Sequence, residues 1–308
     1  MSGAKLIYAV HPHHFLGGKT MKKILAVLLA LSMLFAFAAC GGNNEPETTT
    51  APVEESTDAP VVEDPSVADP SVADPSTADP SVADPSAVDP SAAAPTAMPE
   101  GTEAIVAYFN TAINGVKTNA TSVKRLYSKI SLNGATTLPS AINGILKLLG
   151  GADKFLGDQL AKNSKGEETY TGAQIKAVFP VEGESYASQL TAADVKSATI
   201  AEKDGKWIIT ITTIADGKSS TVKHGQGHAP KAFNVVLPGI VNDNIPGVAT
   251  SIVGTATMNY PSSTVKVTVD PTTGKVLNAT YDLKWTINFD DAGVIIPFTT
   301  LDEFVISY

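Results

Sequence analysis

Two histidines four residues apart, His224 and His228, form the pattern in this chain that most resembles a metal site. On a helix, this spacing would place two imidazoles on one face, where they could bind zinc. Gly225 and Gly227 disfavour a helix, and no third ligand lies nearby in the sequence. The pattern therefore favours a flexible loop between strands, and we expect neither a metal site nor a cofactor.

Residues suited to catalysis are also few. Nucleophilic catalysis would need a serine or cysteine beside a base, and the chain has no Gly-x-Ser-x-Gly motif. Asp290 and Asp291 are adjacent carboxylates, but neighbours on a strand point to opposite faces, so we expect a turn there. Gly144, Gly150 and Gly151 lack the Lys-Ser/Thr of a phosphate-binding loop. The sequence predicts that the protein is not an enzyme.

The only cysteine, Cys40, follows a segment typical of a secretory signal. Met-Lys-Lys at 21–23 precedes an apolar run over 24–37, and small residues follow, which is the order a signal peptide needs. The run is shorter than the ~20 residues of a membrane span. Residues 21–39 are therefore predicted to be a signal peptide, with an uncleaved anchor helix as the alternative. A single cysteine also excludes a disulfide framework and a multi-cysteine zinc or iron–sulfur site.

Phe37-Ala38-Ala39-Cys40 resembles a bacterial lipobox, with Phe37 where leucine is more usual. The resemblance implies that Cys40 is lipidated on its sulfur and becomes the mature N-terminus. Two acyl chains would hold the protein stably, because each buried CH₂ contributes about 0.8 kcal/mol and one chain alone is marginal. We expect a lipid anchor on the extracytoplasmic face of the cell membrane. Since Met21 is a better start than Met1, residues 1–20 are predicted to be an untranslated extension.

Charge is distributed unevenly along the chain. Lys and Arg number 22 and Asp and Glu 31, which gives a net charge of -9. Residues 41–100 contain acids and no base, so the excess negative charge belongs to them, and residues 101–308 are formally neutral. A neutral domain without a basic run is a poor nucleic-acid binder. We therefore expect no nucleic-acid partner.

Residues 40–100 have the composition of a disordered tether behind the lipidated cysteine. From Asp64 the unit Asp-Pro-Ser-Val-Ala repeats with small variations. A five-residue period matches neither helix nor strand, and each proline removes a backbone donor. Residues 43–100 also lack aromatic groups to offset the entropy of ordering. The segment is predicted to be a solvated acidic spacer between the membrane and a folded domain.

From Thr102 the sequence becomes typical of a folded domain. Apolar residues at steps of three and four predict a helix over 103–117, with Thr102 as its N-cap. A further apolar stripe predicts helical segments over 140–149 and 153–162, separated by two glycines.

After residue 165, alternating apolar and polar residues predict strands and hairpins. The expected strands are 196–202, 206–214, 264–269, 277–289, 294–300 and 304–308. The run over 277–289 is far longer than an ordinary strand, so it is expected to twist and curl around a concave apolar face. Pro297 indicates an edge or a bulge. Residues 101–308 are thus predicted to be an α+β domain, with an N-terminal helix and an apolar helical segment packed on a long, curved, half-barrel-like antiparallel sheet.

A leading helix followed by long antiparallel strands, with the turn Val-Asp-Pro-Thr-Thr-Gly-Lys-Val at 269–276, resembles the sheets of LolA-like lipoprotein carriers and related lipid-binding lipoproteins. The chain is also similar to the uncharacterised lipoproteins of Gram-positive gut bacteria of the clostridial type. The first resemblance implies an apolar concavity closed by helices, with residues 142–160 as a lid. The expected function is non-catalytic binding of a lipid or another apolar or amphipathic ligand.

Candidate ligand-binding residues follow from this expectation. They are Leu146, Leu149, Phe155, Tyr281, Trp285 and Phe289. Alternating aromatics are also typical of an ordinary core. The alternative function is therefore a structural or adhesive surface module that binds a cell-wall or host partner, with the concave face filled by its own helix. An empty apolar cavity would favour the carrier, and a solid core with exposed aromatics would favour adhesion.

Overall fold

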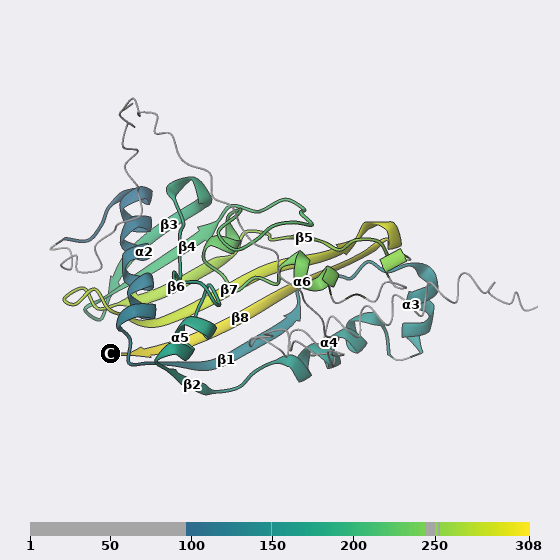
Figure 1. Ribbon diagram of the computed structural model, residues 1–308, viewed down its shortest axis with the longest axis horizontal. Helices are drawn as coiled ribbons and strands as arrows, with labels where there is room; N and C mark the ends of the chain where they lie inside the picture. The colour runs from purple at the N-terminus through teal and green to yellow at the C-terminus, as the bar shows by residue number, and fades with distance from the viewer. Residues whose placement is uncertain (1–96, 149, 244, 246–249, 252) are drawn as a thin grey trace, which may run out of the picture. The chain divides into compact units, whose positions relative to one another are not determined.

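The computed structural model describes residues 97–308, apart from 149, 244, 246–249 and 252 (Figure 1). The expected extension, the signal peptide, Cys40 and the tether up to residue 96 lie outside this part of the chain. The described part is an α+β domain with one long helix and an eight-strand antiparallel open sheet. None of the helices within these residues is long and apolar enough to cross a membrane.

The secondary-structure elements occupy most of the domain. The helices are α2 (Gly101–Asn119), α3 (Ser140–Lys147), α4 (Ala152–Asn163), α5 (Ala173–Val178) and α6 (Pro238–Asp243). The strands are β1 (Ser122–Leu132), β2 (Glu168–Thr171), β3 (Val195–Lys203), β4 (Lys206–Thr213), β5 (Thr257–Asn259), β6 (Thr264–Val269), β7 (Val276–Phe289) and β8 (Val294–Ser307). Short 3₁₀ turns are η1 (Ala192–Asp194), η2 (Ala229–Lys231) and η3 (Asp290–Ala292).

The sheet pairs the first strand of the domain with the last. Across the sheet the strands run β2, β1, β8, β7, β6, β4 and β3, and β5 pairs with β7 beyond the stretch that β6 occupies. The Thr121 N–H donates to the carbonyl of Ser307 at 2.8 Å, which brings β1 alongside β8. The middle of the sheet therefore depends on contacts between the two ends of the domain.

Strands β7 and β8 form the central hairpin and have 14 residues each. The prediction of separate strands over 294–300 and 304–308 was wrong, because Leu301, Asp302 and Glu303 continue the pairing with β7. Asp302 interrupts the apolar alternation, which hides the continuation in the sequence. Pro297 directly precedes Phe298, where the pairing of β8 with β1 ends. Its missing N–H therefore falls at a local edge inside an otherwise central strand.

Helix α2 presents the apolar stripe that its sequence predicted, with Val106, Phe109 and Ile113 almost completely buried. The helix lies across β3, β4 and β7 on one face of the sheet (Figure 1). Its N-cap is Glu100, which makes no capping hydrogen bond through its side chain, so the prediction of Thr102 as N-cap was wrong. The burial of the stripe, rather than a capping side chain, accounts for the position of this helix.

The two faces of the sheet differ in burial. We call the face that carries α2 the covered face and the opposite one the open face. Along the middle of β7, Tyr281 and Leu283 are buried on the covered face, whereas Thr280, Asp282 and Lys284 are half-exposed on the open face. This alternation is what an antiparallel sheet with one solvated face requires.

Long connecting segments supply the other half of the core. The ring of Tyr281 meets Phe179, Phe233 and Phe304 edge-on, with ring centroids 6.3, 5.6 and 6.2 Å apart. Phe179 follows α5, and Phe233 comes from the segment between β4 and β5. Aromatic side chains from the loops therefore pack directly on the middle of the covered face, and both are fully buried.

This packing predicts a large cost for truncating Phe233. We expect Phe233→Ala to lower the free energy of unfolding by about 3–5 kcal/mol, because it leaves a cavity against Tyr281. Urea denaturation of the variant measures this loss. The control is Ile295→Ala, whose side chain is 38% exposed, and we expect it to cost less than about 1 kcal/mol. Equal effects of the two substitutions would contradict the described packing.

Candidate functional site

Three of the candidate ligand-binding residues lie on the covered face of β7. Tyr281, Trp285 and Phe289 are 1%, 5% and 2% exposed, because they alternate along the strand as the sequence predicted. The Trp285 ring stacks on Phe298 with centroids 4.3 Å apart, and its Nε1 donates a 3.0 Å hydrogen bond to the Thr300 hydroxyl. The protein's own side chains thus contact Tyr281 and Trp285.

The other candidates come from the predicted lid. Leu146 on α3 is fully buried, and Phe155 on α4 is partly buried against the same core. Leu149 lies outside the described residues. Helix α4 contacts β1, and Figure 1 shows the two side by side. In this arrangement the helical segment is part of the packed core, and the role of these residues in ligand binding remains a prediction.

Charged residues also lie on the covered face, where β1 and β2 meet. We call Arg125, Glu168, Tyr170, Glu182 and Asp302 the buried ionic cluster, after its buried members Arg125, Tyr170 and Asp302; Glu182 is half-buried and Glu168 is exposed. Arg125 donates to the Glu168 carboxylate at 2.7 Å, and the Tyr170 hydroxyl donates to the same oxygen at 2.7 Å. The guanidinium also lies 5.3 Å from the centre of the Tyr170 ring. Paired register places Arg125 opposite Glu168, so the two strands hold this contact in place.

The two other carboxylates of the cluster are strongly perturbed. Burial raises the pKa of Glu182 to about 7, with the negative charge of Asp302 adding to the effect and Lys165 opposing it. Burial also raises the pKa of Asp302, although hydrogen bonding to Ser128 and the charge of Arg125 oppose this. Glu182 can therefore take up and release a proton near neutral pH.

Two atoms around the cluster are buried without a hydrogen-bond partner among the described residues. They are the Nε of Arg125 and the hydroxyl of Tyr281. Tyr281 lies directly opposite Asp302 in the β7–β8 register, on the same face. A buried carboxyl with a pKa near 7 is the type of group that acts as a general acid or base. Among the described residues, however, no group of three or more potential metal ligands lies beside Glu182. The hydrogen bonds that Glu182 makes connect it to neighbouring segments of the chain.

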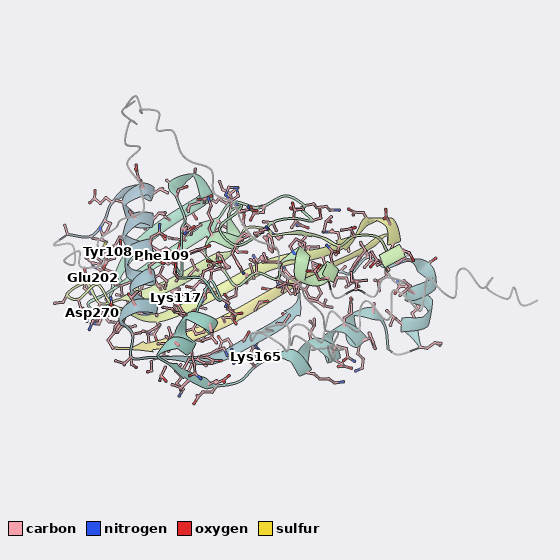
Figure 2. The ribbon with its side chains drawn as sticks, in the orientation of Figure 1. Tyr108, Phe109, Lys117, Lys165, Glu202 and Asp270 are labelled. Atoms are coloured by element: carbon pink, nitrogen blue, oxygen red, sulfur yellow. The ribbon has the colours of Figure 1, made fainter. Side chains whose placement is uncertain are left out.

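Those bonds fix the segment between α5 and β3 on the sheet. The Glu182 N–H donates to the Asn234 side chain at 2.8 Å, and the Asn234 amide donates back to the Glu182 carboxylate at 3.0 Å. From α2, the Lys117 ammonium donates to the carbonyls of Val181 at 2.5 Å and Glu184 at 2.9 Å. Burial lowers the pKa of Lys117 to about 8. Figure 2 labels Lys117 and also Lys165. The backbone of Lys165 forms an isolated antiparallel β-bridge with Ser128 of β1.

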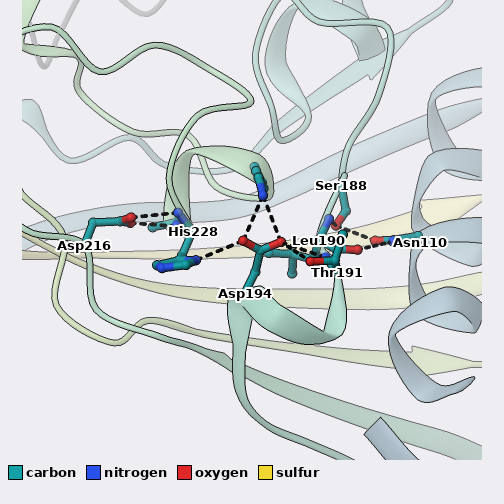
Figure 3. A network of polar contacts seen from close by, with 9 residues as sticks. Asn110, Ser188, Leu190, Thr191, Asp194, Asp216 and His228 are labelled. Carbon is teal, nitrogen blue, oxygen red and sulfur yellow. Dashed lines mark hydrogen bonds and ion pairs between the residues drawn. The ribbon is translucent and has the colours of Figure 1, made fainter. Parts of the chain in front are cut away.

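A second polar network is centred on Asp194 in η1 (Figure 3). Lys231 donates to both of its oxygens at 2.8 and 2.9 Å, and His228 Nδ1 lies 2.9 Å away. Thr191 completes a capping box with Asp194. Burial alone would raise the pKa of Asp194, but the hydrogen bonds from Lys231, Thr191 and His228 lower it to about 2.

The same region is joined to α2 by asparagine side chains. The Ser188 hydroxyl bonds to Asn110 at 2.6 Å, and the Asn110 amide donates to the Leu190 carbonyl at 2.7 Å, as Figure 3 shows. Asn114 accepts hydrogen bonds from the backbone N–H groups of Ala187 and Ser188. These amides replace the strand pairing that a loop over the covered face lacks.

The two histidines lie in the loop that the glycines predicted. Gly225 and Gly227 have φ angles of 75° and 78°, and a Cβ on Gly227 would come within 2.6 Å of Asp216. Asp216 accepts hydrogen bonds from the N–H of His228 at 2.7 Å and of Ala229 at 2.9 Å. Within the described residues no group of three or more histidine, cysteine, aspartate or glutamate side chains could hold a metal ion.

Asp290 and Asp291 form the turn η3 between β7 and β8, as expected. Lys218 makes an exposed ion pair with Asp290 at 2.7 Å. The buried ionic cluster was not predicted from the sequence. A signal for it exists, because Asp302 occupies an inward position in the apolar alternation of β8, where an unpaired charge would be costly.

The open face carries hydroxyl-bearing side chains on neighbouring strands. The register aligns Thr210 of β4, Lys266 of β6 and Thr280 of β7 in one row. In the next row the hydroxyls of Thr212 and Thr264 are 3.1 Å apart. All of these side chains are half-exposed or exposed. The open face is thus a polar surface that spans several strands.

Comparison of the chain with models of protein families, with curated proteins and with solved structures finds no match. The class of protein is therefore given by the fold alone, which is an α+β domain with an open antiparallel sheet.

The raised pKa of Glu182 predicts a pH-dependent stability. Its ordinary value is 4.5 and its folded value is about 7, so the folded state binds the extra proton between these values. The stabilisation is complete below pH 4.5 and is lost as the pH rises through 7. We expect Glu182→Gln to remove about 1–3 kcal/mol of this pH dependence, measured by urea denaturation between pH 4.5 and 8. Glu202→Gln, at an exposed position on β3, should leave the profile unchanged, and an unchanged profile in Glu182→Gln would contradict the assignment.

The Asp194 network predicts a contrast between two aspartate–lysine pairs. Asp194→Asn should lower the free energy of unfolding by about 2–4 kcal/mol, because Lys231, His228 and Thr191 lose a buried carboxylate as their hydrogen-bond partner. Asp290→Asn removes the exposed pair with Lys218 and should cost less than about 1 kcal/mol. Urea denaturation tests both, and hydrogen exchange should show faster opening of residues 216–233 in Asp194→Asn alone. Similar costs for the two variants would refute the central role of Asp194.

Proposed function

We propose that this protein is an extracytoplasmic, lipid-anchored surface module that binds a cell-wall or host partner without catalysis. In this proposal Cys40 carries the lipid and residues 41–100 separate the membrane from the folded domain. The partner is recognised on the outside of the domain rather than in a cavity. This corresponds to the adhesive alternative in the sequence analysis.

The observation that carries the proposal is the filling of the covered face. Phe179 and Phe233 occupy the space over Tyr281, and Phe298 occupies the space beside Trp285. A carrier of the expected kind would leave these positions to an apolar ligand. Opening them would separate buried aromatic rings, each of which contributes on the order of 2–3 kcal/mol by burial alone.

The polar networks add to the cost of opening the covered face. Lys117 holds the backbone near Val181, and Asp194 holds Lys231 near η2. A ligand entering over Tyr281 would have to displace the segments that these groups hold. The middle of the open face needs no such rearrangement, because side chains such as those of Thr210, Thr280 and Lys284 are already in contact with solvent. The geometry therefore favours recognition on the open face.

The experiment compares the two functions in one preparation. The full chain with Cys40→Ser, which lacks the lipidation site, is purified and sedimented with cell walls of a Gram-positive bacterium. We expect it to be absent from the membrane fraction of the producing cells and to co-sediment with the walls. Mass spectrometry of an organic extract of the same protein should show no stoichiometric lipid.

The controls separate the components of the proposal. The wild-type chain should remain in the membrane fraction and release into the aqueous phase only after detergent treatment. If Cys40→Ser stays with membranes, the anchor assignment fails. A stoichiometric lipid in the extract, without wall binding, would favour the carrier function and overturn the surface-module proposal.

A further inference from the structure

Lysine side chains gather on the open face. Lys266 lies between Val265 and Val267, which are buried on the covered face, so strand alternation directs Lys266 to the opposite side. Lys284 lies on β7 between two buried neighbours and follows the same rule. The register and alternation place four further lysines on this face: Lys124, Lys129, Lys203 and Lys206.

Fewer acids oppose these lysines. Among the described strand residues of the open face, the acids are Asp282 and Glu303. Asp282 accepts a 2.8 Å hydrogen bond from the Thr299 hydroxyl. Glu303 accepts one from Tyr127, and this raises the pKa of that hydroxyl. Although residues 101–308 are formally neutral, this face therefore has an excess of positive charge.

Some of the lysines are already paired, and others are available. Lys124 makes a 2.7 Å ion pair with Glu167, and Lys206 a 2.9 Å pair with Asp270. In the part of the chain that the structure describes, no ion pair involves Lys203, Lys266 or Lys284.

Lys129 has an aromatic neighbour rather than an acid. Its ammonium lies 4.4 Å from the centre of the Tyr127 ring. Such a contact leaves the charge free to attract an anion.

The positive charges are spread over the sheet instead of converging on one point. They lie on β3, β4, β6, β7 and β1, with β8 between the last two. At about 4.8 Å per strand, this arrangement spans roughly 24 Å. Threonine hydroxyls lie among the lysines: Thr210 and Thr280 flank Lys266 in its row, and Thr264 lies on the same face of β6. A distributed set of ammonium and hydroxyl groups matches a chain of repeated anions and hydroxyls better than a single small anion.

We propose that the open face binds a linear polyol-phosphate polymer, with the lysines contacting phosphates and the threonine hydroxyls contacting polyol hydroxyls. This inference rests on the proposed function and names the chemistry of its partner. A lipid bilayer is a poorer match, because the partners of Lys266 and Lys284 in their rows are threonines rather than large apolar side chains, and Ile208, Leu301 and Val305 on this face are only half-exposed. A nucleic acid is a poorer match as well, since Tyr127 is the aromatic residue that the described strands place on this face for base stacking.

The test uses the full chain with Cys40→Ser and poly(glycerol phosphate) as the probe. Affinity is measured by isothermal titration calorimetry at 50 and 300 mM salt. We expect binding that weakens with salt, because the contacts are ionic and solvent-exposed. We expect the double variant Lys266→Glu/Lys284→Glu to weaken it at least tenfold. The matched control is Lys162→Glu/Lys223→Glu, which makes the same change in net charge at exposed positions on α4 and in the segment after β4, and it should change affinity less than threefold.

Folding is monitored by circular dichroism and thermal unfolding, and Lys266→Gln/Lys284→Gln serves as a milder second variant that should also weaken binding. The proposal is overturned if the parent Cys40→Ser chain does not bind the polymer, or if both charge-reversal pairs weaken binding equally. It is also overturned if phosphatidylglycerol vesicles or a single-stranded oligonucleotide bind as tightly as the polymer. Wall binding that survives Lys266→Glu/Lys284→Glu would refute this inference but leave the surface module intact, whereas absence of wall binding by the parent chain would refute the surface module itself.

Discussion

The alternation of side chains along the paired strands β7 and β8 is the constraint on which the rest of the domain depends. The two strands are in register from Asn278 to Phe289, and a slip of one residue would exchange the two faces. Trp285 stacked on Phe298 fixes the pairing from the covered side. Everything packed on that side, from α2 to the loop that carries Phe233, requires this register. The polar and basic open face is the other consequence of the same alternation.

Buried charges determine how the covered face is closed. Lys117, Arg125 and Asp194 each come from a regular element or its end and bind groups of another segment. A buried charge is costly unless it is bonded, so each of them favours one position for the segment that it holds. Apolar packing alone would tolerate several arrangements of these long loops. The networks thus explain how segments with little regular structure can form one wall of a core, and they favour recognition on the outside of the domain.

Much of the regular structure was predictable from local patterns. The helix over 103–117, the segments around α3 and α4, the β3–β4 hairpin and the long strand β7 are all confirmed. Strand β1 was missed, since it contains Arg125 and two lysines and so lacks a clean alternation. Its inward charge is tolerated only because Glu168 and Tyr170 lie beside it. The buried ionic cluster was missed for the same reason, because its members come from β1, β2, β8 and the segment after α5.

By itself, the sequence determined the features that depend on neighbours in the chain: the helical and strand periods, the turns, the neutral charge of the domain and the resemblance of Cys40 and its surroundings to a lipobox. Only the tertiary structure decided which aromatic side chains fill the covered face, which strand joins β8 on its other side, and that the lysines of distant strands share one surface. These features depend on contacts between residues far apart in sequence. A local pattern records the period of a side chain but not the partner that it meets.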